Sequence, residues 1–217
     1  MVDTTECVTA RLVSAFAATW SAIRRRHPDV PDVVVTIGSG TLGVKQGRKV
    51  LGHFAAGRWH VGDTDKVPEL FISGEGLQRS PEEVLGTLLH EAAHGVAHTR
   101  EIKDTSRQGR YHNKRFKALG EELGLILEED PAIGWSVTCV PTKTSNVYRA
   151  EVGRIKEALV AYRHAEVVLP GKPRSSNLAV ATCGCDRKIR VAKSTLIEAP
   201  ILCGRCGIEF AAEDEDE

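Results

Sequence analysis

The stretch Ser80–Thr99, SPEEVLGTLLHEAAHGVAHT, predicts one uninterrupted helix around which the rest of the chain is organised. Ser80 is a favourable N-cap, Pro81 stands where a first-turn proline is tolerated, and Glu83 completes a capping box. Apolar side chains then recur at helical spacing and predict one buried face: Val84, Leu85, Leu88, Leu89, Ala92 and Val96. We therefore expect an amphipathic helix packed on a core.

The same helix carries His90-Glu91-Ala92-Ala93-His94. Residues four apart on a helix differ by about 40° of rotation and roughly 6 Å of rise, so His90 and His94 can bind one zinc ion. Glu91 is rotated by about 100° from His90, which places its carboxylate beside a metal-bound water as a general base for attack on a carbonyl. The alternative is a chance string of structural histidines. The capping box and the apolar face favour the metal site.

A catalytic zinc requires three protein ligands and one open position. His112 is the expected third ligand, because it shares a face with Phe116 on a second predicted helix and would point toward the same core. Glu121 and Glu122 remain alternatives, although neither aligns as well with that face. His98 lies about 12 Å along the helix axis from the first histidine of the motif, which is too far to share an ion.

Length and composition set broad limits. The 217 residues, 41% of them hydrophobic, suffice for one domain and a small second module. Lys plus Arg equals Asp plus Glu, at 29 each, so the total charge does not favour nucleic acid. Asp3 and Glu6 stand where a signal peptide would be basic, and no apolar run approaches about 20 residues. We expect a cytoplasmic protein with no membrane partner.

The segments around the motif helix predict a small, mostly antiparallel sheet with further helices. Amphipathic helices are expected at 5–26 and 146–164. Short β-branched runs separated by turn residues predict strands at 33–37, 50–55, 58–61 and 69–73. An edge strand of such a sheet can bind an extended peptide by β-augmentation. The glycine-rich segment 38–43 lacks the Gly-Lys-Ser/Thr ending of a phosphate loop and is interpreted as a strand connection.

The C-terminal region predicts a second, structural zinc site. Its ligands would be two thiolate pairs: Cys183 with Cys185, and Cys203 with Cys206. A module of about 40 residues requires such a cross-link to fold. The two remaining cysteines, Cys7 and Cys139, stand alone and are interpreted as unreactive apolar residues.

Positive charge gathers in this module. From Lys172 to Arg205 there are seven Lys or Arg residues against two acidic residues. Lys188 and Arg190 are therefore weak candidates for contacts with a phosphate backbone, although a solvated face is the commoner explanation. A Pro-, Gly- and Ser-containing hinge at 170–176 precedes the module and an acidic tail at 213–217 ends it.

The H-E-x-x-H helix, a short polar loop and then His112-x-x-x-Phe116 resemble the SprT-like zinc metallopeptidases, the family that includes Spartan. That family usually has Gly after the third histidine, where this chain has Asn113. The cysteine pattern is similar to the zinc ribbon that ends bacterial SprT proteins. The resemblance covers roughly 33–125 and 178–210. A longer metallopeptidase motif is excluded, because Gly and a third His are missing from its positions after the second histidine.

The resemblance implies an α+β fold: a zincin-like core with a small antiparallel sheet and the H-E-x-x-H helix, plus a C-terminal zinc ribbon. It implies two Zn²⁺ ions, one catalytic on three histidines and one structural on four cysteines, with Glu91 as acid/base. It also implies protein substrates, and for Spartan-type members proteins bound to DNA. The expected organisation is a core at 1–128, a helical linker region at 129–169, the ribbon at 170–212 and a disordered tail at 213–217.

We therefore expect a zinc-dependent endopeptidase. One alternative is a DNA- or protein-binding adaptor whose protease core is vestigial, and another is a zinc hydrolase that acts on a non-peptide amide. The intact Glu91 and the three candidate ligands favour an enzyme, because a vestigial site has no chemical reason to keep both the base and the ligands.

Overall fold

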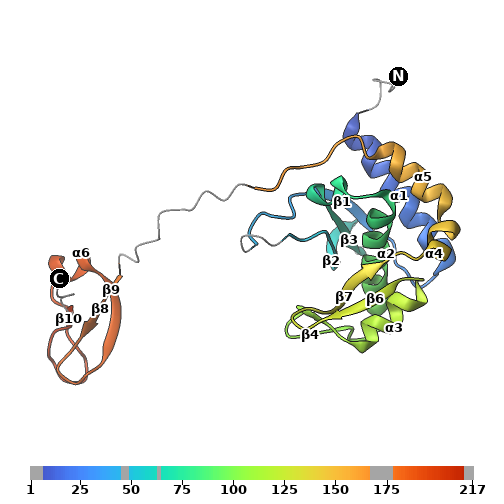
Figure 1. Cartoon of the computed structure of the whole chain (residues 1–217). Coiled ribbons are helices and arrows are strands. Elements are labelled where there is room, and N and C mark those ends of the chain that lie inside the picture. Colours follow the sequence, from blue (N-terminus) through green and yellow to red (C-terminus); the bar gives the residue numbers. More distant parts are fainter. Residues whose placement is uncertain (1–6, 45–48, 63–64, 167–177, 213–217) are drawn as a thin grey trace. The chain divides into compact units, whose positions relative to one another are not determined.

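The computed structural model describes residues 7–44, 49–62, 65–166 and 178–212. The chain divides into two compact units, Met1–Glu166 and Val167–Glu217, which we describe separately (Figure 1). Both mix helices with small sheets, as expected for an α+β protein. The expected hinge at 170–176 and the acidic tail at 213–217 lie outside the described residues. In the described part of the chain, every helix is too short or too polar to cross a membrane.

Helix α2 (Pro81–Thr99) runs through the middle of the first unit and confirms the predicted motif helix. The Ser80 side chain accepts a hydrogen bond from the Glu83 backbone N–H at 3.2 Å, and the Ser80 N–H donates to the Glu83 carboxylate at 2.9 Å. The predicted apolar face is buried to 1% exposure or less at every position. Local capping and burial of one face therefore both stabilise α2.

Helices α1 (Val8–Arg26), α4 (Thr142–Val147) and α5 (Arg149–Ala158) lie together on one side of α2 (Figure 1). Phe16 and Trp20 of α1 and Ile155 of α5 are completely or almost completely buried in the same core. This corrects two expectations. Of the expected linker region 129–169, residues 129–166 belong to the first unit because their apolar side chains pack there, and residues 167–169 lie outside the described residues. Instead of the single helix expected at 146–164, the structure has the two shorter helices α4 and α5.

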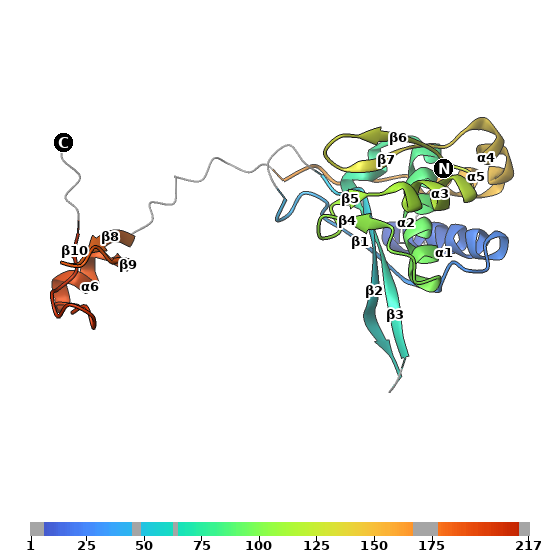
Figure 2. The ribbon, with the colours of Figure 1, turned by 90° about the horizontal axis from the view of Figure 1, so that it is seen from below.

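The first sheet contains β1 (Val34–Gly38), β2 (Gly52–Val61) and β3 (Asp65–Ser73) in the order β1-β3-β2. Strand β1 pairs with β3 in parallel and β2 pairs with it antiparallel. The sheet was expected to be mostly antiparallel, but one of its two strand pairings is parallel and the other is antiparallel. Strands β2 and β3 form a hairpin that projects from the unit (Figure 2), and β2 is an edge strand of this sheet.

The second sheet contains β4 (Thr105–Ser106), β5 (Tyr111–His112), β6 (Ile126–Asp130) and β7 (Gly134–Cys139), in the order β4-β5-β7-β6. Helix α3 (Lys114–Glu122) connects β5 to β6. Gly134 has a φ of +74°, and a Cβ there would lie 2.1 Å from the His112 carbonyl oxygen. Only glycine permits this close pairing of β7 with β5.

The second unit is a small three-stranded sheet with one short helix. Strand β8 (Leu178–Thr182) lies between β10 (Ala211–Ala212) and β9 (Lys188–Ala192), and α6 (Lys193–Glu198) follows β9. Its buried core consists of Ala181, Cys183, Cys203 and Phe210. A core of this size cannot stabilise an independent fold without a cross-link or a bound metal.

The glycine-rich segment 38–43 makes a strand connection that is held by Glu75 of the 3₁₀-helix η1 (Gly74–Gln78). The buried Glu75 carboxylate accepts hydrogen bonds from the Gly40 N–H at 2.8 Å and from the Thr41 hydroxyl at 2.8 Å, and it pairs with Arg163 at 3.1 Å. Burial alone would raise the pKa of Glu75, but these hydrogen bonds outweigh burial and lower it to about 2. The segment therefore surrounds a protein carboxylate.

We expect Glu75→Gln to lower the free energy of unfolding by about 2 kcal/mol at neutral pH, because an amide loses the charge-assisted hydrogen bonds. The pKa of Glu75 is lower in the folded chain than its ordinary value of 4.5. Its stabilisation is therefore complete above that value and is lost as the pH falls toward about 2. Urea titrations of both proteins should show the gap narrowing between about pH 5 and about pH 3. A gap that is constant over this range would contradict the prediction.

Candidate metal centre and the adjoining cavity

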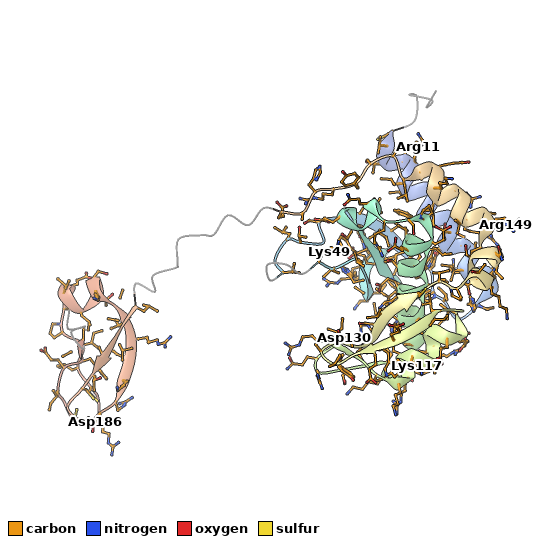
Figure 3. All side chains as sticks on the ribbon, in the orientation of Figure 1. Arg11, Lys49, Lys117, Asp130, Arg149 and Asp186 are labelled. Atoms are coloured by element: carbon orange, nitrogen blue, oxygen red, sulfur yellow. The ribbon has the colours of Figure 1, made fainter. Side chains whose placement is uncertain are left out.

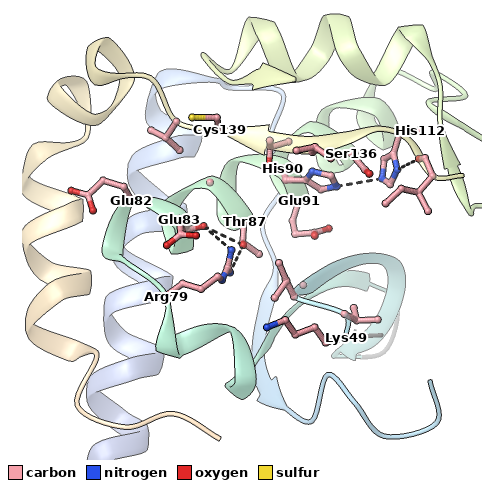
Figure 4. Close-up of a pocket in the computed structure, with 18 of the residues that line it drawn as sticks. Lys49, Arg79, Glu82, Glu83, Thr87, His90, Glu91, His112, Ser136 and Cys139 are labelled. Carbon is pink, nitrogen blue, oxygen red and sulfur yellow. Dashed lines mark hydrogen bonds between the residues drawn. The ribbon is translucent and has the colours of Figure 1, made fainter. Parts of the chain in front are cut away.

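Three imidazole nitrogens converge beside helix α2 (Figure 4 shows His90 and His112). The Nε2 atom of His112 lies 3.3 Å from that of His90 and 3.1 Å from that of His94. One nitrogen from each ring lies within 4.8 Å of the other two, a spacing that can hold a metal ion. The structure thus brings together the three residues expected from the sequence.

His112 reaches this position from a strand, which corrects the expected helical placement. It is the last residue of β5, and helix α3 begins after it. Asn113 caps α3, because its side chain accepts hydrogen bonds from the backbone N–H groups of Arg115 at 2.7 Å and Phe116 at 3.3 Å. Asn113 therefore ends the strand and starts the helix, and His112 stays outside the helix.

The other candidate ligands are held elsewhere. Glu121 pairs with Lys117 at 3.6 Å, and Glu122 pairs with Arg100 at 2.7 Å. The ring of His98 packs against Phe54, with 5.9 Å between the ring centroids. None of the three joins the histidine group in the described residues.

Two hydrogen bonds on the far sides of the rings orient the centre. Nδ1 of His94 lies 2.5 Å from a carboxylate oxygen of Asp104, and Nδ1 of His112 lies 3.1 Å from the Ile133 carbonyl oxygen. An Nδ1–H that donates outward leaves Nε2 unprotonated and available to a metal. Asp104 was not singled out from the sequence, where its only signal is an acidic residue in a polar loop.

The floor of the centre is apolar. The Phe116 ring lies 4.7, 4.6 and 4.5 Å, between centroids, from the rings of His90, His94 and His112. Burial lowers the pKa of His90 well below its ordinary value, and it also lowers the pKa of His112. Neutral imidazole is the form that ligates metals, so this surrounding favours a metal site.

Glu91 is buried next to the histidines, with 5% of its surface exposed. Burial raises the pKa of Glu91 to about 7, against the effects of nearby His94 and of a hydrogen bond from the Phe54 backbone, which lower it. A carboxyl group with a pKa close to the operating pH can both accept and return a proton. Glu91 can therefore take up and release a proton beside the histidines.

Strand β2 covers Glu91 closely at its first residue. A Cβ on Gly52 would lie 2.8 Å from Cγ2 of Thr87 and 3.1 Å from Oε1 of Glu91. The edge strand can approach α2 to this distance only with glycine. The sequence offered one signal for this role, a glycine inside the strand predicted at 50–55.

A cavity of about 770 Å³ opens beside the centre (Figure 4). Its walls come from the start of β2, the first half of α2, and β7 with the residues that flank it. The lining residues are Lys49, Val50, Leu51, Gly52, Arg79, Glu82, Glu83, Gly86, Thr87, His90, Glu91, Arg110, His112, Ile133, Ser136, Val137, Thr138, Cys139 and Val140. Two of the three histidines and Glu91 therefore face a space that can admit a ligand.

The second unit contains a separate cysteine group. One sulfur from each of Cys183, Cys185, Cys203 and Cys206 lies within 4.8 Å of the others, a spacing that can hold a metal ion. Hydrogen bonds from the backbone N–H groups of Cys206 and Arg205 lower the pKa of Cys203 to about 6. A thiolate is the form that ligates zinc. Cys7 and Cys139 are exposed and lie outside the group.

The two basic candidates lie on one strand of this unit. Lys188 and Arg190 are two residues apart on β9, so they share a face of the sheet, and both are exposed. Figure 3 labels Asp186, which lies in the turn before this strand. The position of Lys188 and Arg190 is compatible with a contact to an anionic partner.

Comparison of the chain with protein-family models, with curated proteins and with solved structures finds no match.

Proposed function

We propose that the chain is a zinc-dependent endopeptidase of the SprT-like type. The single observation that carries the proposal is the convergence of three Nε2 atoms beside the buried Glu91, at the wall of an open cavity. Three histidines with one open position are the ligand set of a catalytic zinc. Four closely grouped cysteines support a second, structural zinc in the ribbon.

A zinc ion on the three histidines would supply Lewis-acid polarisation of a water and of a peptide carbonyl. The residues of the chain then have defined tasks. Glu91 accepts the proton of the attacking water and returns it to the leaving amine, for which a pKa of about 7 is well suited. Asp104 and the Ile133 carbonyl hold His94 and His112 in the orientation that ligation requires.

The shape of the site favours an extended peptide as substrate. Strand β2 is an edge strand, and its first residue, Gly52, lines the cavity next to Glu91. An edge strand offers unpaired backbone groups with which a peptide can form a further strand. Backbone pairing of this kind would position the scissile bond regardless of which side chains flank it.

The test is to load the purified chain with zinc and incubate it with a protein substrate, in parallel with Glu91→Gln. We expect fragments from the first protein only. If both proteins bind a partner and neither cleaves any substrate, the vestigial adaptor replaces the endopeptidase. Release of ammonia or an amine from a small amide, with no peptide cleavage, would instead identify a zinc hydrolase of another type.

We expect Cys203→Ser to unfold the ribbon and leave the core folded. The described residues of the ribbon include four buried core residues, so it requires a metal to hold it, whereas the first unit has its own extensive core. Limited proteolysis should degrade the region after residue 177 while a fragment of the first unit persists. The matched control is Cys139→Ser, an exposed cysteine outside both metal groups, which should leave both units resistant. Loss of both units in Cys203→Ser would contradict the prediction.

DNA-bound proteins are the substrate class that we propose for the full chain. We expect cleavage of a DNA-bound protein to be faster than cleavage of the same protein free, because Lys188 and Arg190 add electrostatic attraction to the phosphate backbone. The gain should shrink between low and physiological salt and on changing both residues to Ala. Equal rates with and without DNA at low salt would remove DNA from the proposal and leave the ribbon as a protein-docking or structural module.

A further inference from the structure

The cavity wall contains a cation that the proposed chemistry does not use. Arg79 lies between η1 and α2, and its guanidinium is held by three neutral acceptors (Figure 4). Its Nε donates to the Gly76 carbonyl at 3.0 Å, one Nη donates to the Glu83 carbonyl at 3.3 Å, and the other Nη donates to the Thr87 hydroxyl at 2.7 Å. The group is therefore fixed in place before any ligand arrives.

This guanidinium forms no direct ion pair among the described residues, although the charge of the Glu83 carboxylate acts to raise the pKa of Arg79. In the described ranges of the chain, no Asp or Glu oxygen lies within 4.0 Å of Arg79. The nearby Glu83 carboxylate accepts instead from the Ser80 N–H of the capping box. Burial lowers the pKa of Arg79, which means that its charge is partly removed from water. Three of its five N–H groups are used, so two remain for a ligand.

Among the charged side chains that line the cavity, Arg79 is the best placed to bind a carboxylate. Lys49 and Arg110 also line the cavity, but both are exposed to water, which screens their charge. Glu82 and Glu83 add two negative charges to the lining, and Glu83 is engaged at the helix start. A role in holding η1 to α2 would account for the hydrogen bonds of Arg79, but it would not account for the two N–H groups that remain free of a direct ion pair at the cavity wall.

We propose that Arg79 and Thr87 form a subsite of the cavity for a carboxylate of the substrate peptide, named here the Arg79 subsite. The inference rests on the proposed function and adds its substrate class: peptides with an acidic group close to the scissile bond. A guanidinium binds a carboxylate through two parallel N–H donors, an arrangement that a neutral amide cannot match in strength.

The position of the Arg79 subsite on α2 determines how far the acidic group lies from the scissile bond. Thr87 precedes Glu91 by four residues, one turn of α2, which corresponds to about 6 Å along the helix axis. Successive residues of an extended peptide are about 3.3 Å apart. The carboxylate is therefore one or two residues from the bond that is cleaved. It belongs either to an acidic side chain or to a free C-terminus.

The test compares matched peptides on zinc-loaded Glu91→Gln protein, so that binding is measured without cleavage. The first set consists of peptide pairs that carry Glu or Gln at one position, with that position moved along the peptide from pair to pair. The second set is one peptide made with a free and with an amidated C-terminus. We expect about tenfold tighter binding of one acidic member, as measured by fluorescence anisotropy. A preference in the first set identifies a side chain, and a preference in the second identifies the C-terminus.

Variants separate this role from a structural one. Arg79→Gln should remove the preference while binding of the amide peptides is unchanged, and Arg79→Lys should keep part of it. Arg154→Gln, an exposed cation on α5 outside the cavity, should keep all of it. Equal binding of acidic and amide peptides, or an equal loss of both in Arg79→Gln, overturns the subsite. A preference without any cleavage by the wild-type chain retains the subsite and rejects the endopeptidase.

Discussion

Glu91→Gln should reduce cleavage of protein substrates by roughly two to four orders of magnitude while both proposed metal ions stay bound. Gln has the shape of Glu but cannot accept the proton of the attacking water. The carboxylate is buried at 5% exposure beside the histidines, and burial raises its pKa to about 7, so no exposed group can readily replace it. Initial rates of fragment release, together with metal analysis of the same samples, measure the two effects separately.

The control for this prediction is Glu128→Gln, an exposed carboxylate on β6 that does not line the cavity. It should cleave at the wild-type rate. If Glu91→Gln cleaves as fast as the wild type, Glu91 is not the base, and the proposed mechanism fails. If it loses one metal ion, the loss of activity no longer reports on proton transfer, and the role of Glu91 is structural.

His112→Ala should lower the metal content from two ions per chain to one and abolish cleavage. His112 supplies one of only three converging nitrogens, and two histidines alone bind zinc far more weakly than three. Strand β5 should persist, since its pairing with β7 uses backbone groups, including the hydrogen bond of 2.9 Å from the His112 N–H to the Ile133 carbonyl. The cysteine group in the second unit should retain its ion.

The matched control is His60→Ala, an exposed histidine on β2 that belongs to neither metal group. Metal analysis should return two ions for this protein. A count of two in His112→Ala would show that another group completes the site, and Glu121 and Glu122 would have to leave their partners Lys117 and Arg100 to do so.

Local sequence was sufficient to predict helix α2 and the two histidines on it that could bind a metal ion. The capping box, the apolar face and the spacing of His90 and His94 all act within about one helical turn, so neighbouring residues encode them without help from the rest of the chain. The four cysteines were predictable for a related reason, because paired cysteines at short spacing restrict the chain to few arrangements.

The third histidine of the group was predictable by residue but not by element. Its expected place on a helix followed from its spacing to Phe116, whereas Asn113 is the N-cap and α3 begins only at Lys114, two residues after His112. The spacing of His112 to Phe116 correctly placed both side chains on the same side of the core. The side-chain hydrogen bonds of Asn113 decided that the backbone at His112 is a strand and not a helix. The domain boundary expected after residue 128 was wrong for another reason. An amphipathic pattern predicts that a helix has a buried face, but it does not show which core that face packs on.

The remaining features of the site depend on contacts between segments distant in sequence. Asp104 meets His94 across a loop, Gly52 meets Glu91 across 39 positions of chain, and Arg79 reaches the cavity through contacts with η1 and α2. No spacing pattern in the sequence predicts these contacts, because the two residues of each contact do not lie on the same helix or strand. The sequence by itself determined which groups can bind a metal and accept a proton. Tertiary packing decided which strand covers Glu91 and which cation faces the cavity, since these depend on how separate elements fill shared space.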